Sequence, residues 1–181
     1  MTTVRDRIIA AAEPVFDRHG FAGTGVDRLT AAASVSSRTL YKHLGSKTGV
    51  IVAVLGARCG RFERVFDVNS VEQLFDSLGS WFETEGSRGC LFLRAMGEGG
   101  EFVPEVAETV QRYRETLHGT VARVIEHETG GADELLIEQL LVLIEGATAA
   151  ASYRGERTVR VARALAVELV SSHRRPATER S

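Results

Sequence analysis

A short polar cluster between residues 37 and 43 carries the side chains best suited to recognition chemistry in this sequence. Hydroxyl, phenol, guanidinium, ammonium and imidazole groups are supplied there by Ser37, Arg38, Thr39, Tyr41, Lys42 and His43. Such groups hydrogen-bond to base edges and phosphate oxygens of duplex DNA. Leu40 and Leu44, four residues apart in the same segment, would place an apolar face opposite the polar one. The pattern predicts a short helix that reads a DNA groove.

Two short helices joined by a turn are the elements that would position this cluster. The spacing predicts helices over Val26–Ala33 and Ser37–Leu44, separated by residues 34–36. Ser36 is the expected N-cap of the second helix, because its hydroxyl can accept hydrogen bonds from amides of the first turn. A longer helix over about residues 3–19 would pack behind the pair. This arrangement is a helix-turn-helix.

Helical periodicity continues after residue 50, with no alternation typical of strands. Further helices are expected over about residues 47–66, 71–84, 90–96, 104–128, 133–153 and 158–172. We therefore predict an all-α fold. A three-helix helix-turn-helix DNA-binding domain would occupy residues 1–50, and a six-helix domain would occupy residues 51–181.

Charge is distributed unevenly along a chain whose net charge is -2. Residues 1–50 hold seven basic and four acidic side chains, a net charge of +3, whereas the remainder carries -5. Only the first part is thus suited to a polyanionic partner. No apolar run approaches the roughly 20 residues that span a bilayer, and the N-terminus lacks the apolar segment of an export signal. We expect a cytoplasmic protein without a membrane partner.

Several runs in the first part of the chain keep a fixed spacing without gaps. They are Arg7–Ala12, Phe16, His19–Phe21, Thr24, Leu29–Ser36 and Thr39–Lys47. Together they make residues 5–55 resemble the DNA-binding domain of the tetracycline-repressor (TetR) family. The sequence departs from the family pattern at Ser34, where glycine is usual, and at Leu44 and Thr48. Ser34 must therefore adopt a turn conformation that glycine adopts easily.

The resemblance implies roles for individual residues. Those expected to face base edges or flanking phosphates are Ser36, Ser37, Arg38, Thr39 and His43. Those expected to hold the DNA backbone are Thr24, Gly25, Arg28, Tyr41, Lys42 and Lys47, the last together with a helix N-terminus. The alternative is that these polar side chains merely solvate a small helical domain.

The resemblance also implies a function, and it assigns effector binding and dimerisation to the six-helix domain over residues 51–181. It indicates a ligand-responsive repressor that binds a pseudo-palindromic operator as a homodimer, with no enzymatic activity and no cofactor. Two alternatives remain open: an activator, or a protein that binds a small molecule without inducible repression.

Two apolar stripes between residues 136 and 169 are candidates for the dimer interface. They comprise Leu136, Leu140, Leu143, Ile144, Ala147 and Ala151, followed by Ala162, Leu165, Ala166 and Leu169. Two such helices from each subunit would form a four-helix bundle across a two-fold axis. The alternative is that they complete the core of one subunit.

A pocket for an apolar or aromatic effector is expected among the helices that follow residue 47. Its candidate wall residues are Phe62, Phe66, Trp81, Phe82, Phe92, Met96, Tyr113 and His118. Aromatic residues at helical spacing also fit an ordinary core. The polar Tyr113 and His118 in an otherwise apolar stripe favour the pocket.

Other chemistry finds little support in the sequence. In the run Glu126-His127-Glu128, neighbouring side chains point in different directions on a helix, so it forms a poor metal cage. Cys59 and Cys90 are interpreted as inert thiols rather than a redox switch, because neither lies in a cationic or capping context that would clearly activate it.

Overall fold

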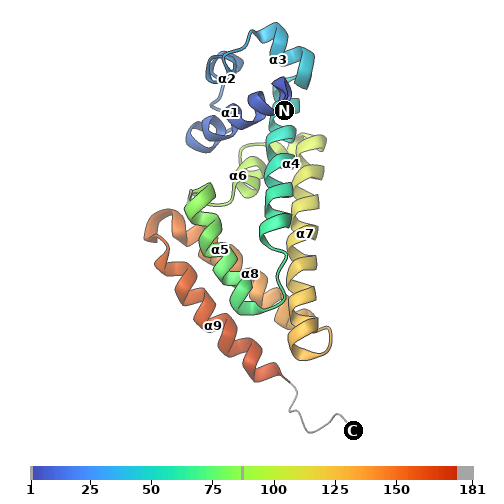
Figure 1. Ribbon diagram of the computed structural model, residues 1–181, viewed down its shortest axis with the longest axis vertical. Helices are drawn as coiled ribbons and strands as arrows, with labels where there is room; N and C mark the ends of the chain where they lie inside the picture. Colours follow the sequence, from blue (N-terminus) through green and yellow to red (C-terminus); the bar gives the residue numbers. More distant parts are fainter. Residues whose placement is uncertain (1, 87, 175–181) are drawn as a thin grey trace. The chain divides into compact units, whose positions relative to one another are not determined.

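The computed structural model describes residues 2–86 and 88–174, which are helical with short connections (Figure 1). The helices are α1 (Val4–His19), α2 (Val26–Ala33), α3 (Ser37–Leu44), α4 (Lys47–Val65), α5 (Val71–Glu85), α6 (Leu91–Gly97), η1 (Gly100–Phe102, a 3-10 turn), α7 (Pro104–Thr129), α8 (Glu134–Arg154) and α9 (Arg157–His173). The predicted all-α class is confirmed. Each α-helix begins and ends within about one residue of its expected limits.

Side-chain caps explain where several helices begin. At the start of α1, the Thr3 hydroxyl accepts from the Asp6 N–H, while the Asp6 carboxylate accepts from the Thr3 N–H at 3.0 Å. This reciprocal pair is a capping box. Hydrogen bonds from the side chain and then the backbone of Thr3 hold the pKa of the Asp6 carboxyl below its usual value. Ser36 and Ser46 cap α3 and α4 with their hydroxyl groups, which accept from the N–H groups of Thr39 and Gly49.

The chain forms two compact units. One comprises Met1–Arg61 with Leu91–Tyr113, and the other comprises Phe62–Cys90 with Arg114–Ser181. By these limits α4 and α7 each contribute to both units. The domain boundary predicted after residue 50 was placed at the end of the helix-turn-helix motif and differs from the limits of these two units. That boundary stays a prediction.

In the first unit, α1 packs against α2 and α3. Their shared core contains Ile8, Ala12, Phe16, Phe21, Leu29 and Leu40, all buried. The rings of Phe16 and Phe21 stack with centroids 4.8 Å apart. Because Phe21 lies in the turn after α1, this stack fixes the path of the chain into α2.

In the second unit, α9 packs against both α5 and α8 (Figure 1). Leu74, Phe75 and Leu78 of α5 are buried, as are Ala162 and Ala166 of α9. At the surface, Arg163 of α9 forms an ion pair with Asp76 of α5, with Nε 2.8 Å from Oδ1. Small alanine side chains on α9 let the helices approach closely.

One helix, α8, is both long and apolar. Although charged residues interrupt its apolar runs, α8 has 21 residues and contains an 18-residue stretch with a mean hydropathy of 1.5, so by length and composition alone it could cross a membrane. About a third of that stretch is buried inside the subunit. Leu136, Leu140 and Ile144 are among its buried residues, as expected of a helix in a protein core.

Candidate DNA-binding surface

The turn between α2 and α3 has the geometry of a helix-turn-helix. Ser34 ends α2 with φ 53° and ψ 46°, the left-handed conformation that glycine adopts most easily. Among the described residues it is the only non-glycine residue with positive φ. Its N–H donates to the Ala31 carbonyl, and the Val35 N–H donates to the Thr30 carbonyl. The strained turn predicted at Ser34 is confirmed.

The first turn of α3 is fixed by its cap. The Ser36 hydroxyl accepts from the Thr39 N–H at 3.1 Å and lies 2.9 Å from the Thr39 hydroxyl. The predicted cap at Ser36 is therefore confirmed. The two hydroxyl groups already contact each other, and each keeps further hydrogen-bonding capacity for a base edge or a phosphate.

One face of α3 is buried and the other is open to solvent. Leu40 is fully buried and Leu44 is half-buried against the rest of the unit. The exposed side chains are Ser37, Arg38, Tyr41, Lys42 and His43, with Thr39 half-buried beside them. Gly25 and Arg28 are exposed near the start of α2. The structure thus brings the predicted base-reading residues of α3 onto one exposed surface, and their contacts to DNA stay a prediction.

Thr24 has a position that the sequence did not indicate. Its side chain is fully buried, and its hydroxyl donates to the Gly20 carbonyl at 2.6 Å. The side chain therefore stabilises the turn between α1 and α2. In this conformation its hydroxyl faces the protein, not a phosphate.

Two residues from much later in the chain hold the same turn. The Glu98 carboxylate accepts from the Ala22 N–H at 2.8 Å. Arg94 donates to the Asp17 carbonyl at 2.9 Å, near the end of α1. Lys47 also reaches the turn, since its Nζ lies 3.4 Å from the Ala22 carbonyl oxygen. Sequence reasoning missed Arg94 and Glu98, because these contacts join segments 76 or 77 residues apart.

A second ionic cluster joins α1 to α4. Glu13 accepts from Arg58 at 2.8 Å and from Arg61 at 2.5 Å, with both guanidinium groups on the same carboxylate oxygen. Arg58 is almost completely buried and Glu13 is largely so. Removal of the carboxylate would leave a buried charge without this counterion, so the cluster fixes α1 on α4.

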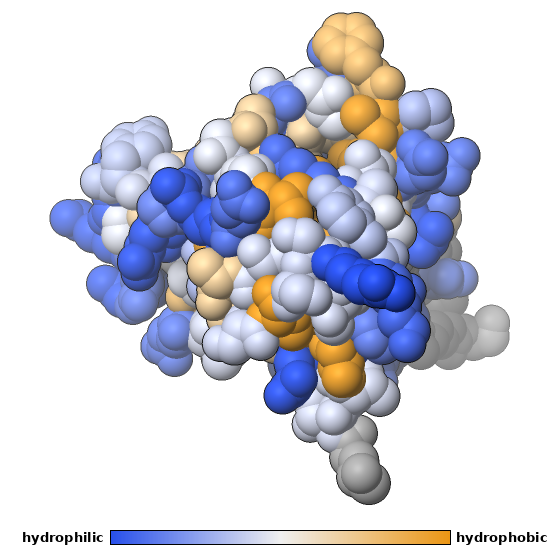
Figure 2. Space-filling view, turned by 90° about the horizontal axis from the view of Figure 1, so that it is seen from above, coloured by the Kyte–Doolittle hydropathy of each residue, from blue (hydrophilic) through white to orange (hydrophobic). Residues whose placement is uncertain are grey.

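Hydrophilic residues predominate on the face that carries α2 and α3. Figure 2 looks onto that face and shows hydrophobic residues only in separate small areas. Polar and cationic groups with little apolar area suit a partner whose surface is lined with phosphates.

The residues proposed for an effector pocket divide into separate clusters. In the second unit Phe62, Phe66 and Trp81 are buried, and the Phe62 and Phe66 ring centroids lie 4.1 Å apart. In the first unit the Phe92 and Tyr113 rings stack at 3.8 Å. Phe82 is buried, Met96 is half-buried, and His118 lies 3.9 Å from the Glu134 carboxylate at the surface. The predicted pocket stays a prediction.

The residues proposed for the dimer interface also divide into two groups. Seven are buried within the single subunit, namely Leu136, Leu140, Ile144, Ala147, Ala151, Ala162 and Ala166. Leu143 and Leu169 are half-buried, and Leu165 is exposed. The first group belongs to the core of the subunit, as the alternative anticipated, and only the second group has surface available for a partner.

Within residues 2–86 and 88–174, no group of three or more His, Cys, Asp or Glu side chains could hold a metal ion. Cys59 is buried and Cys90 is half-buried. The interpretation of these cysteines as inert thiols stays a prediction.

Comparison with known proteins agrees with this geometry. Residues 8–54 match the family described as bacterial regulatory proteins, tetR family. A TetR-family transcriptional regulator from Streptomyces coelicolor superimposes with a TM-score of 0.83 at 23% identity, over 95% of this chain and 96% of that one. No curated protein matches the chain.

Two further solved structures show the same fold. One is a putative TetR transcriptional regulator from Streptomyces avermitilis, with a TM-score of 0.79 and 24% identity over 94% of this chain and 98% of that one. The other is a TetR-family regulator from Cytophaga hutchinsonii, with a TM-score of 0.79 and 18% identity over 95% of each chain. At these identities the likeness establishes the fold.

The fold and the exposed face of α3 define a helix-turn-helix protein of the kind that regulates transcription by binding DNA. The predicted resemblance is confirmed: residues 8–54 match the tetR family of bacterial regulatory proteins, and the chain has the fold of solved regulators that bear the TetR name.

Proposed function

We propose that this protein is a homodimeric repressor that binds a pseudo-palindromic operator through α3 and releases it when a small molecule binds. The observation that carries the proposal is the surface of α3. Its polar and cationic side chains are exposed while Leu40 anchors the helix from the other face. A short helix with these two faces can enter a major groove and remain rigid.

Different side chains of α3 and its neighbours would contact the bases and the phosphates of the DNA. Arg38 would contact base edges, because a guanidinium can donate two parallel hydrogen bonds to guanine. Lys42, Arg28 and Lys47 would contact phosphates and set the register of the protein on the duplex. Two copies of α3 would lie roughly 34–36 Å apart, about one turn of DNA, in successive major grooves.

Dimerisation would use the outer surfaces of α8 and α9. Leu165 is half exposed, and Val142 on α8 is exposed by 66%. Large apolar side chains that are exposed on adjacent helices are typical of a surface that contacts another protein. A two-fold arrangement of two helices from each subunit would form a four-helix bundle.

Release of DNA would be driven by an effector bound in the helical part after residue 50. Such a ligand can act only if its affinity differs between the DNA-binding and the non-binding conformations. The contacts of Arg94 and Glu98 with the turn before α2 give α6 a direct mechanical connection to the DNA-binding helices. Movement of α6 would therefore displace that turn.

The experiment that tests the proposal is a binding assay with the DNA that flanks the gene. We expect a salt-sensitive complex with a footprint of two half-sites about one helical turn apart, overlapping promoter elements. A chemically varied library should contain compounds that raise the melting temperature and weaken operator binding together. A footprint upstream of the promoter core would favour activation instead. A library without effect on either quantity would contradict the inducible part of the proposal.

A further inference from the structure

A groove between α1 and α4 in the first unit has the dimensions of a ligand site. Its volume is about 620 Å³, and all the residues that line it lie within Met1–Arg61 and Leu91–Tyr113. Pockets for small molecules usually measure about 300–1,000 Å³. Positions 5, 6, 9, 10 and 13 of α1 and positions 49, 52, 53, 56 and 57 of α4 line it, so one face of each helix borders the groove.

The floor of the groove consists of small and apolar residues. Ala10 of α1 contributes to it, as do Ala53, Gly56 and Ala57 of α4. A Cβ added to Gly56 would meet no atom within 4 Å, so the space beside this part of α4 is open. These residues offer apolar contact and no side-chain hydrogen bond. They suit the apolar body of a small molecule.

Charged side chains surround this floor. Arg5, Arg61 and Arg112 line the groove from three different helices, α1, α4 and α7, and Asp6 and Glu13 line it from α1. Because the cations outnumber the carboxylates, the groove favours an anion. The two carboxylates disfavour a ligand with several negative charges. The charges therefore select an anion with a single charge.

Both carboxylates of the groove already have partners. The Asp6 carboxylate accepts from the Thr3 N–H at 3.0 Å. One oxygen of Glu13 accepts from both Arg58 and Arg61. These acidic groups are thus held by the protein itself, and they do not need a cationic ligand.

Two of the three cations, by contrast, are not paired. Within residues 2–86 and 88–174, the side chains of Arg5 and Arg112 form no ion pair, and Arg112 does not pair even with Glu108, one turn earlier on α7. Arg5 is next to Asp6 in the sequence, so a carboxylate partly offsets its charge. Arg112 is therefore the cation best placed to hold an anionic group in this groove.

An exposed arginine without a partner is not by itself a binding site, since arginine is usually exposed. Arg5 and Arg112 differ from other surface arginines because they border one cavity, together with Arg61 and an apolar floor. A guanidinium can donate two parallel hydrogen bonds to a carboxylate, which fixes the orientation of the bound group. The combination suits an organic acid better than an inorganic anion, because only the former has an apolar body.

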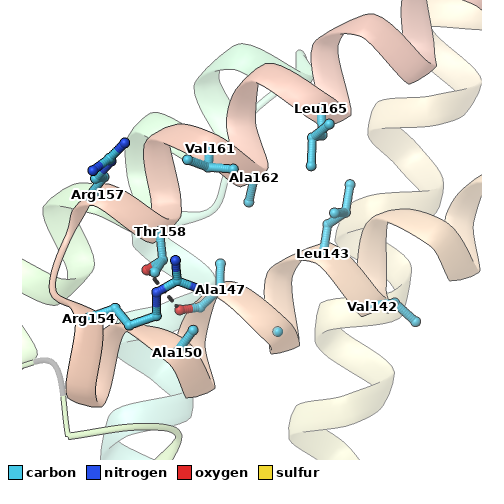
Figure 3. A pocket seen from close by; sticks show the side chains of 11 residues that line it. Val142, Leu143, Ala147, Ala150, Arg154, Arg157, Thr158, Val161, Ala162 and Leu165 are labelled. Carbon is cyan, nitrogen blue, oxygen red and sulfur yellow. Dashed lines mark hydrogen bonds between the residues drawn. The ribbon is translucent and has the colours of Figure 1, made fainter.

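The cavity between α8 and α9 is of a different kind. It measures about 450 Å³, and Figure 3 shows Leu143 and Leu165 pointing toward each other from the two helices at one side of it. At the other side the Thr158 hydroxyl donates to the Ala147 carbonyl at 3.3 Å. Its apolar walls belong to the surfaces of α8 and α9 that dimerisation would use. The groove on α1 and α4 includes no residue of those surfaces.

We propose that the groove between α1 and α4 binds a small organic acid with one carboxylate and an apolar body. Arg112 pairs with the carboxylate, Arg5 adds to the positive potential, and the apolar body lies on the alanine and glycine floor of α4. The inference goes beyond the proposed function, because no residue assigned to DNA contact or to the effector pocket lines this groove.

A pair of probes that differ only in charge tests the ligand class. Calorimetric titration of the full chain at neutral pH should give a dissociation constant below about 1 mM for 2-naphthoate, as ordinary ligand efficiency allows for about 13 non-hydrogen atoms. The neutral 2-naphthamide should bind at least about tenfold more weakly, because it cannot form the charge-assisted pair. Inorganic phosphate should bind more weakly than 2-naphthoate. Equal affinity for the acid and the amide, or tighter binding of phosphate, would overturn the proposal.

Substitution of Arg112 tests the group that holds the carboxylate. Arg112→Gln should weaken 2-naphthoate about tenfold and leave 2-naphthamide unchanged, since only the charged pair is lost. Arg114→Gln removes another exposed charge from α7, outside the groove, and is the matched control. If Arg112→Gln binds the acid as tightly as the wild type, the assigned role of Arg112 is wrong.

A leucine at Gly56 tests the position of the site. Gly56→Leu should abolish binding of 2-naphthoate, because the new side chain would occupy the open space of the groove. The melting temperature should not fall, since leucine favours a helix more than glycine does. Gly119→Leu, at an equally open position of α7 outside the groove, should keep the wild-type affinity. If the leucine variant does not fold, the exposed substitution at Arg112 still decides the question.

The outcomes are independent of the proposed function. A folded Gly56→Leu protein that still binds 2-naphthoate would place the ligand elsewhere and overturn the inference. A wild-type protein that binds operator DNA but neither naphthalene probe would also overturn it, and would leave the proposed repressor intact.

Discussion

The carboxylate of Glu98, just after α6, accepts a hydrogen bond from the backbone N–H of Ala22, in the turn before α2, at 2.8 Å. Four residues earlier, Arg94 donates to the carbonyl oxygen of Asp17 near the end of α1. Arg94 and Glu98 also form an ion pair at 4.0 Å. The chain that leads into the helix-turn-helix is therefore held in place by residues that follow position 90.

Substitution of Glu98 tests this connection. Glu98→Ala should lower the free energy of unfolding by about 1 kcal/mol, because a charge-assisted hydrogen bond is lost. Operator affinity should fall by less than about tenfold, since the caps of α3 are unaffected. Urea unfolding and a DNA-binding titration measure the two quantities. Glu98→Gln keeps an acceptor oxygen, so its free energy of unfolding should lie between those of the wild type and Glu98→Ala. If Glu98→Ala is as stable as the wild type, the contact is dispensable.

Substitution of two cationic residues, Arg38 and Lys47, should change DNA binding in different ways. Arg38→Ala should reduce the preference for operator over random DNA by about 1–3 kcal/mol, because a base contact is lost. Lys47→Ala should weaken both complexes and make the salt dependence shallower by about one phosphate contact. Competition binding at several salt concentrations distinguishes them. Arg18→Ala removes an exposed charge from α1 and is the control; equal losses on both DNAs for Arg38 and Lys47 would refute the assigned roles.

The left-handed turn at Ser34 offers a stabilising substitution. Ser34→Gly should raise the free energy of unfolding by about 0.5–1 kcal/mol, because glycine adopts φ 53° without the steric cost that serine carries. The greater flexibility of glycine in the unfolded chain offsets part of this gain. Ser34→Ala keeps the strained conformation and serves as the comparison. A glycine variant less stable than the alanine variant would show that the serine hydroxyl matters more than the backbone.

The capping box at the start of α1 predicts a pH effect. The pKa of the Asp6 carboxyl is lowered by the side-chain and backbone hydrogen bonds of Thr3. Its contribution to stability is therefore present above the ordinary value of 3.8 and is lost as the pH falls through the lowered pKa. Thr3→Ala should raise the pKa of Asp6 toward its ordinary value in an NMR titration. Thr2→Ala, which changes the neighbouring residue, should leave it unchanged.

Much of this fold could be predicted because its signals are local. Thr3, Ser36 and Ser46 cap the helices that follow them, and a regular apolar period marks the helices in between. The polar face of α3 could also be predicted from the sequence, since one short helix contains both the exposed cluster and the buried Leu40.

The rest depends on contacts between distant segments. Burial of Thr24 follows from its bond to Gly20 within a compact turn, and the sequence does not distinguish this from exposure. The bond from Ala22 to Glu98 joins residues 76 apart. In α8 apolar residues occupy nearly every side, so periodicity could not separate Leu140, which is buried in the subunit, from Val142, which is exposed. Only packing determines which side faces a partner.

The most direct test of the account is the affinity of the purified protein for its flanking duplex, measured as a function of salt concentration. We predict that the logarithm of the binding constant falls linearly with the logarithm of salt concentration, with a slope near -0.9 for each phosphate contacted. Replacement of both Arg38 and Lys42 by alanine should make that slope shallower and abolish the preference for the operator. Absence of salt-sensitive binding to any duplex would contradict the assignment of α3 as a DNA-reading helix.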